Sequence, residues 1–347
     1  MATEAGKIDL KILVVVLVIM ATSAAVVSVL LLDTTGQSGS GLSEAFSYDL
    51  TELARVDPNL IMYEELNRPL ATGFTQSRAL ALVSDGRILV AGDKAIRIFD
   101  RSGNLQRVIE VAGEPRCLTV APDGNIYAGL GDHVEVFDGG GRRLASWDPL
   151  GEEAVLTSIA VHRDSVFVAD AGHRVVLHYD HAGELLDHIG EKDPDRNIPG
   201  FVVPGPHMDV AVPRDGLLRV SNPGRHRIEA YTTDGDLEFW WGQPSADIER
   251  FCGCCNPVNF ALLPKDGFVT SEKGLVRVKV YNSDGGFVGV VAGHNDLTGG
   301  VQAKICETPE QCQGAGLDVA ADADGRVYIL DPEKNVIRIF ARKETGQ

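Results

Sequence analysis

The stretch GFVVPGPHMDVAVPRDGLLRVSNPGRHRIEAYTTDGDLEFWWG, residues 200–242, decides the fold. It contains an alternating apolar segment, DVAV, then an Asp-Gly turn, a second apolar segment and the polar loop NPGRH. A third segment ends on Tyr231, and a second Asp-Gly turn leads to LEFWW. Period-two alternation with glycine turns is typical of β-strands, so the stretch predicts four antiparallel strands.

The same pattern recurs through the chain, for example as ALALVSDGRILVAGDKAIRIFDRSG at 79–103. In each copy the third predicted strand closes on an aromatic residue, and these aromatics lie 38 to 59 residues apart. They are Phe99, Phe137, Tyr179, Tyr231, Tyr281 and Phe340. Repeats at this period are typical of propeller blades, so we expect an all-β, six-bladed β-propeller. Because the chain ends soon after the last third strand, we expect Pro58–Leu70 to supply the missing outer strand of blade six.

The copies resemble NHL repeats, and 200–242 follows the family pattern G-x-F-x-x-P, D-V-A-V, D-G, R-I and W-G closely. The resemblance covers roughly residues 49 to 344 and implies a six-bladed propeller, as in the peptidyl-hydroxyglycine lyase domain and bacterial surface proteins. The segments GCCNP, TSEKG and RVKVY of the fifth copy look like a recurrent variant blade of bacterial NHL proteins. Because propellers host many activities, the resemblance specifies fold more closely than function.

The N-terminus has a different character. Residues 12–32 contain no charge over 21 positions, and a helix of that length would span about 30 Å, the thickness of a bilayer core. Lys7 and Lys11 precede this segment, and Asp33 follows it. The positive-inside rule therefore predicts a single-pass anchor in the inner (cytoplasmic) membrane, with the propeller in the periplasm or outside the cell. The alternative is a cleaved signal peptide.

We accordingly expect four regions along the chain. They are a cytoplasmic tail at 1–11, a transmembrane signal anchor at 12–32, a flexible linker at 33–48 and the propeller at 49–345. Lys and Arg number 32 against 49 Asp and Glu, which gives a formal net charge of −17. Such an acidic chain repels phosphate backbones, so we expect no nucleic acid partner.

Five of the six cysteines fall before predicted inner strands of neighbouring blades. Cys252, Cys254 and Cys255 precede the fifth, and Cys306 and Cys312 precede the sixth. Three interpretations remain open: disulfides between the two loops, as expected in an exported protein; a metal site holding Zn, Cu or an iron–sulfur cluster; or a reactive dithiol. An adjacent pair such as Cys254 and Cys255 would form a bridge only with strain.

A second candidate site lies where the inner strands begin. The residue that opens each inner strand, in blade order, is Ala79, Cys117, Ser158, Asp209, Asn259 or Asp318. In a propeller this position borders the axial channel. Asp209, Asn259 and Asp318 would therefore bring three oxygen ligands together around a hard cation such as Ca²⁺, with His207 near the same mouth. The alternative is that these side chains bond inner-strand amides and channel water.

The sequence predicts a membrane-anchored binding or assembly module, with a protein partner on the face that carries the cysteine loops. Two alternatives stay open. One is a redox or electron-transfer subunit that binds a metal or iron–sulfur cluster through Cys252, Cys255, Cys306 and Cys312. The other is a cation-dependent hydrolase or lyase resembling the lactonase and hydroxyglycine-lyase propellers. In this chain Ala79 stands where the lactonase propellers have an acidic ligand in the first blade, and the histidine set of the lyase has no matching motif. No residue is therefore assigned a catalytic role.

Overall fold

The structure is a computed structural model that describes residues 16–20, 22–23, 50–301 and 316–344. The chain divides into two units, Met1–Asp49 and Leu50–Gln347. In the first unit, residues 16–20 are helical. The rest of the predicted anchor at 12–32 lies mostly outside the described residues, as do Cys306 and Cys312. Within the parts of the chain that are described, no helix combines the length and apolar character needed to cross a membrane.

The second unit contains six four-stranded antiparallel sheets, which confirms the predicted six-bladed propeller. Blade one contains β2 (Ser77–Leu82), β3 (Ile88–Gly92), β4 (Ala95–Phe99) and β5 (Leu105–Glu110). Blade two contains β6 (Pro115–Val120), β7 (Ile126–Leu130), β8 (His133–Phe137) and β9 (Arg143–Ser146). Blade three contains β10 (Leu156–His162), β11 (Ser165–Asp170), β12 (Val175–Tyr179) and β13 (Leu185–Ile189).

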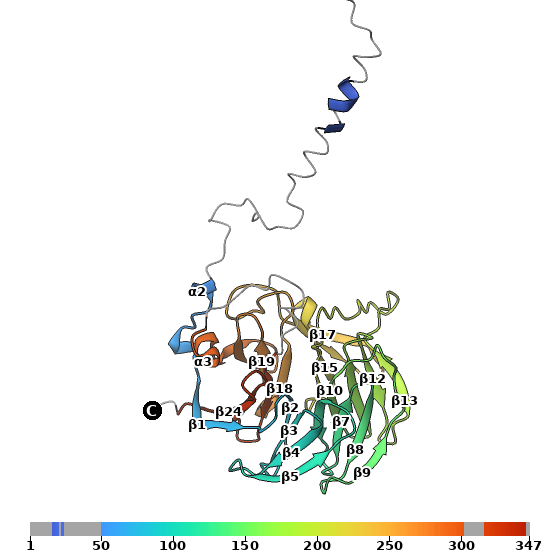
Figure 1. The fold of residues 1–347 in the computed structure, drawn as a ribbon, viewed down its shortest axis with the longest axis vertical. Helices are drawn as coiled ribbons and strands as arrows, with labels where there is room; N and C mark the ends of the chain where they lie inside the picture. Colours follow the sequence, from blue (N-terminus) through green and yellow to red (C-terminus); the bar gives the residue numbers. More distant parts are fainter. Residues whose placement is uncertain (1–15, 21, 24–49, 302–315, 345–347) are drawn as a thin grey trace, which may run out of the picture. The chain divides into compact units, whose positions relative to one another are not determined.

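The remaining blades follow the same plan. Blade four contains β14 (Val210–Ala211), β15 (Leu218–Asn222), β16 (Arg227–Tyr231) and β17 (Leu237–Trp241). Blade five contains β18 (Asn259–Leu262), β19 (Phe268–Glu272), β20 (Arg277–Tyr281) and β21 (Phe287–Ala292). Blade six contains β22 (Asp318–Ala321), β23 (Val327–Asp331), β24 (Val336–Arg342) and the N-terminal strand β1 (Tyr63–Ala71). In Figure 1 the inner strands β2, β10 and β18 lie at the centre, and the outer strands β5, β9 and β13 lie at the rim.

Short helical segments lie before β1 and between later strands. They are α2 (Leu50–Leu53), η2 (Pro58–Leu60), η3 (Pro223–Arg225), η4 (Pro264–Asp266) and α3 (His294–Thr298). The Asp-Gly turns form as predicted: Gly86 has φ 91°, and the amide of Arg87 donates to Asp85 Oδ1 at 3.0 Å. The positive φ suits glycine, and the carboxylate replaces a backbone acceptor, so this dipeptide turns the chain between the first two strands.

Ring closure also confirms the prediction from sequence. β1 pairs antiparallel with β24, with Glu65 opposite Phe340. Glu65 Oε1 accepts a hydrogen bond from Arg338 Nε at 2.8 Å. The N-terminal strand therefore covers the edge of blade six, which would otherwise expose unpaired backbone groups.

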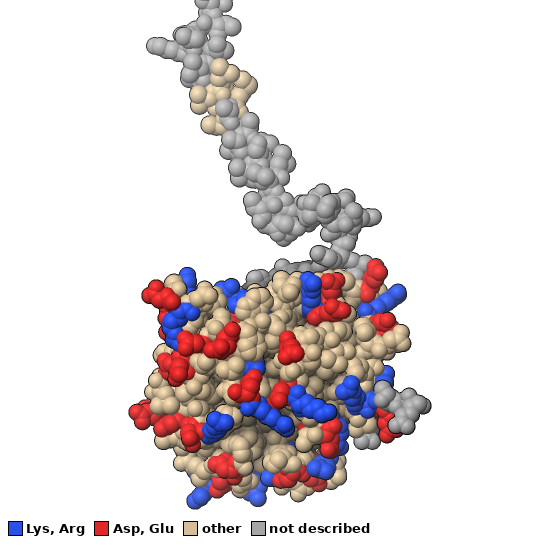
Figure 2. Space-filling model, turned by 180° about the vertical axis from the view of Figure 1, so that it is seen from behind, with Lys and Arg blue, Asp and Glu red and all other residues tan. Residues whose placement is uncertain are grey.

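The core consists of six apolar clusters, one between each pair of consecutive blades, including blades six and one. The aromatic residues that end the third strands are all buried in these clusters. Each blade therefore buries both of its faces against neighbours, and the ring leaves only the axial channel, the two loop faces and the rim for function. On the face shown in Figure 2, acidic and basic side chains are interspersed.

Candidate functional site: the mouth of the axial channel

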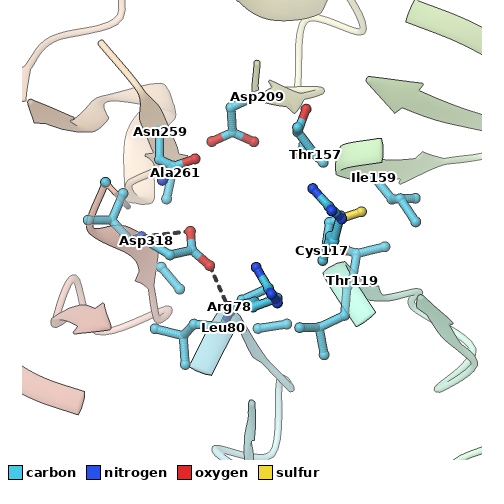
Figure 3. Close-up of a pocket in the computed structure, with 18 of the residues that line it drawn as sticks. Arg78, Leu80, Cys117, Thr119, Thr157, Ile159, Asp209, Asn259, Ala261 and Asp318 are labelled. Atoms are coloured by element: carbon cyan, nitrogen blue, oxygen red, sulfur yellow. Dashed lines mark hydrogen bonds between the residues drawn. The ribbon is translucent and has the colours of Figure 1, made fainter. Parts of the chain in front are cut away.

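The six residues that the sequence predicted at the openings of the inner strands all line one cavity of about 710 Å³. Figure 3 shows Asp209, Asn259 and Asp318 converging on this cavity from blades four, five and six. His207 also lines it. The structure therefore brings together the four channel residues selected from the sequence.

Asp209 and Asp318 each connect two consecutive blades. Asp209 Oδ1 accepts from its neighbour Val210 N at 2.9 Å, and Oδ2 accepts from Phe260 N of blade five at 2.7 Å. Asp318 repeats this arrangement. Its Oδ1 accepts from Val319 N at 2.8 Å, and its Oδ2 accepts from Leu80 N of blade one at 2.7 Å.

Ser158 and Asn259 occupy the same repeat position in blades three and five and also form hydrogen bonds to the next blade. Ser158 Oγ accepts from Val210 N at 3.3 Å and so connects blade three to blade four. Asn259 reverses the polarity: its Nδ2 donates to Leu317 O at 2.8 Å. Fixing the amide nitrogen of Asn259 in this way leaves Oδ1 on the channel side (Figure 3). Polar side chains at this position therefore bond inner-strand backbone groups, as one of the two interpretations predicted.

The electrostatics of the two carboxyl groups are unusual. Burial raises the pKa of Asp209 to about 6, against the hydrogen bonds from Ser158 and from two backbone amides that lower it. The pKa of Asp318 is raised to about 7, first by burial and then by the negative charge of Asp209. Among residues 50–301 and 316–344, neither carboxyl group forms an ion pair, and no basic side chain contributes to either shift. The cavity therefore holds two mutually repelling acids, neither of which forms an ion pair within the described residues.

Sequence reasoning missed two arginines at the same mouth. Arg78 and Arg116 immediately precede the opening residues of blades one and two, and both line the cavity. Arg78 Nη2 donates to Gln76 Oε1 at 2.7 Å and to Glu114 Oε2 at 2.8 Å, and Figure 3 shows its guanidinium in the channel. Arg116 is exposed. The signal that could have revealed them is arginine at the same repeat position in two consecutive blades.

The cysteine loop lies between β17 and β18. Cys252, Cys254 and Cys255 carry free thiols, as does Cys117, whose pKa burial raises to about 12. Within the described parts of the chain, no three His, Cys, Asp or Glu side chains gather to hold one metal ion. The predicted partners Cys306 and Cys312 lie outside the described residues, so both the disulfide and the four-thiolate hypotheses stay predictions.

A buried ionic cluster connects TSEKG and RVKVY of blade five to the residues that precede GCCNP. Glu272, Arg277 and Lys279 are at most 1% exposed. Glu272 Oε2 accepts from Arg277 Nε at 2.7 Å and lies 3.2 Å from Lys279 Nζ. Glu272 Oε1 accepts from Cys252 N at 2.9 Å.

Lys279 Nζ also donates to Arg250 O at 2.6 Å, and burial lowers the pKa of Lys279 to about 8. The cluster therefore fastens the backbone on either side of Phe251 to blade five. It lies under the cysteine loop and determines where that loop sits.

Known proteins share the fold of this chain. No family model matches the chain, and no curated protein matches its sequence. A Bacteroides thetaiotaomicron protein of unknown function is 14% identical, with a TM-score of 0.57 over 81% of this chain and 73% of its own. A gluconolactonase from Xanthomonas campestris is 16% identical, with a TM-score of 0.56 over 79% of this chain and 89% of its own. A virginiamycin B lyase from Staphylococcus aureus is 11% identical, with a TM-score of 0.51 over 81% of this chain and 99% of its own. Similarity at this level concerns the fold alone, and what it identifies is an all-β, six-bladed propeller.

Proposed function

We propose that this propeller is a binding module whose site is the channel mouth, where Asp209, Asn259 and Asp318 hold a hard divalent cation such as Ca²⁺. One observation carries the proposal: two carboxyl groups with raised pKa values face one cavity, and neither forms an ion pair with a basic side chain of the described residues. Uncompensated carboxylates in a desolvated site either take up protons or attract a cation.

The residues present fit a hard cation. Each carboxylate oxygen accepts one amide hydrogen bond and keeps a further lone pair for a ligand bond. Two carboxylates and one amide oxygen are ligand types that Ca²⁺ prefers. Because Ca²⁺ takes six to eight oxygen ligands, several positions would remain for water or for a bound molecule.

Arg78 and Arg116 extend the proposal to a class of ligand. Guanidinium groups recognise carboxylates and phosphates through paired hydrogen bonds. With a cation on blades four to six and two arginines on blades one and two, the cavity suits a small oxygen-rich anion.

The test of this proposal is calcium binding measured by isothermal titration calorimetry on metal-free protein. We expect one site with a Kd of about 10⁻⁴ to 10⁻³ M, the range of extracellular Ca²⁺ modules. Asp209→Asn and Asp318→Asn should each weaken binding by about tenfold or more, because each removes a charged ligand. Asp148→Asn changes an exposed acid outside the cavity and should leave binding unchanged. Unaltered binding in the Asp209→Asn/Asp318→Asn double variant would refute the proposal.

A hydrolase or lyase of the lactonase type is the second candidate. The observation that favours it is His207, which lines the same cavity and carries an imidazole, the side chain best suited to move protons near neutral pH. Lactone turnover that requires both Ca²⁺ and His207 would support this candidate. Calcium binding without lactone turnover would instead favour the binding module.

We also propose that residues 12–32 anchor the protein in the inner membrane, with the propeller on the outer side. The support is the uncharged 21-residue segment preceded by Lys7 and Lys11. Full-length protein should stay in the membrane fraction after alkaline carbonate extraction, and a variant that lacks residues 1–32 should be released without extraction. Release of both forms, or an N-terminus cleaved within residues 12–32, would contradict the anchor.

A further inference from the structure

The two adjacent cysteines of the 251–255 loop are positioned to react with each other. Cys254 Sγ and Cys255 Sγ lie 3.2 Å apart. A disulfide needs about 2.05 Å, so on oxidation the sulfurs would approach by about 1 Å, and the bond would carry the strain expected of an adjacent pair. Cys254 is exposed and Cys255 is buried, so one sulfur meets solvent and the other lies behind it.

Contacts on both sides hold the loop in this conformation. Asn256 Nδ2 donates to the carbonyls of Cys252 and Lys273, and Asn256 Oδ1 accepts from Lys273 N at 2.9 Å. On the other side, His226 Nε2 lies 2.7 Å from Gly253 O. Gly253 has φ 89°, a conformation that favours glycine, and it turns the chain immediately before the two cysteines. The thiols are therefore presented by a fixed loop.

The third cysteine of the loop has a different environment. Cys252 packs beside Ala54 and Leu275 in a small apolar cluster, and its amide donates to the buried Glu272. Its role is to join the loop to blade five, so the candidate reactive pair is Cys254 and Cys255.

We propose that Cys254 and Cys255 form a redox-active dithiol that exchanges with small organic disulfides. In the first step the Cys254 thiol loses its proton and its sulfur attacks the organic disulfide. A mixed disulfide forms, and one thiolate leaves and takes up a proton. In the second step the Cys255 sulfur, after losing its proton, attacks Cys254 Sγ and the second thiolate leaves. The protein loses two electrons and two protons, and the organic disulfide becomes two thiols.

The environments of the two sulfurs indicate which cysteine attacks first and which one resolves the mixed disulfide. Cys254 attacks first because it is exposed, and access controls the rate of exchange. Burial, followed by the hydrogen bond with Cys254, raises the pKa of Cys255, and Lys273 acts in the opposite direction. Cys255 is therefore the resolving cysteine, which acts only within the loop. This chemistry is separate from cation binding in the channel, so either proposal can fail alone.

The test uses oxidised glutathione as the probe on the reduced full chain, followed by alkylation, proteolysis and mass mapping. We expect a Cys254–Cys255 disulfide without a stable glutathione adduct. Cys255→Ser should trap glutathione on Cys254. Cys254→Ser should make reaction at Cys255 slower than reaction at Cys254 in the unsubstituted protein by about tenfold or more, because only the buried sulfur of the pair remains. Cys252→Ser is the matched control, and exchange at the pair should survive it.

Two outcomes would overturn the proposal. In the first, Cys254 and Cys255 are both still alkylated after the reduced protein has been incubated with oxidised glutathione, so no disulfide has formed between them. In the second, either cysteine is found bonded to another cysteine of the chain. Because the mapping of the unsubstituted protein decides both outcomes, the test does not depend on any variant folding.

Discussion

Replacing Glu272 by glutamine is expected to lower the free energy of unfolding by about 3–5 kcal/mol, as breaking a buried ion pair usually does. Glutamine keeps the shape of the side chain but has one acceptor oxygen instead of two. It can therefore accept from the amide of Cys252 or from Arg277, but not from both through separate oxygens. Arg277 and Lys279 would then remain buried without their shared negative charge. Urea denaturation followed by tryptophan fluorescence measures the change, because Trp241 packs against Phe251 and Tyr281 in the same region.

The control for this prediction is Glu238→Gln, an exposed glutamate on β17, which should change stability by less than about 0.5 kcal/mol. A second measurement separates a local effect from a global one. Because Glu272 accepts from the amide of Cys252, its loss should also speed alkylation of Cys255 in the folded protein. A loss of less than about 1 kcal/mol from Glu272→Gln would show that the cluster is not a buried charge network.

The blade architecture could be predicted because its causes are local and repeated. Alternation, Asp-Gly turns and a terminal aromatic such as Phe99 or Tyr231 identify each blade without knowledge of its neighbours. Ring geometry then places all opening residues at one channel. The position of Asp209 beside the inner strand of blade five therefore followed from repeat position alone.

The side-chain networks could not be predicted in the same way. In RVKVY, alternation places Arg277 and Lys279 on the same face of one strand. It does not indicate that Glu272, which lies opposite Arg277 on the neighbouring strand, contacts both of them. Similarly, one interpretation of the sequence grouped Cys252 and Cys255 as metal ligands, whereas in the structure the turn at Gly253 precedes a contact between the sulfurs of Cys254 and Cys255. These arrangements depend on rotamers and loop conformations that no repeat encodes.

The acidic pair at the channel connects stability, proton binding and the proposed function. Asp209 and Asp318 contribute to the fold because they join blades four to five and six to one. They also oppose it electrostatically, since ionising both places two negative charges in one cavity. A divalent cation between the two carboxylates would relieve this repulsion, so both groups could stay ionised and keep their hydrogen bonds to the next blade. The pH dependence of the free energy of unfolding tests this directly.

In metal-free buffer we expect the free energy of unfolding to fall by about 4 kcal/mol between about pH 5 and pH 8, since each unit of pKa shift is worth 1.36 kcal/mol. The folded-state pKa values of about 6 for Asp209 and about 7 for Asp318 lie above the ordinary value of 3.8. Between these values the native protein holds protons that the unfolded chain has released. This contribution to stability is therefore fully present below about pH 4 and is lost as the pH rises through 6 and 7.

Urea denaturation at each pH, with and without Ca²⁺, measures this dependence. Saturating Ca²⁺ should flatten or reverse the slope, because it binds only the ionised carboxylates of the folded protein. In the Asp209→Asn/Asp318→Asn double variant the slope should be smaller and insensitive to Ca²⁺, since neither residue titrates. Histidines and other groups that titrate in this range contribute equally to both proteins, so the difference between the two slopes belongs to the channel pair. Equal slopes in the two proteins would mean that the carboxyl groups ionise without cost, and the reason to expect a cation at this mouth would disappear.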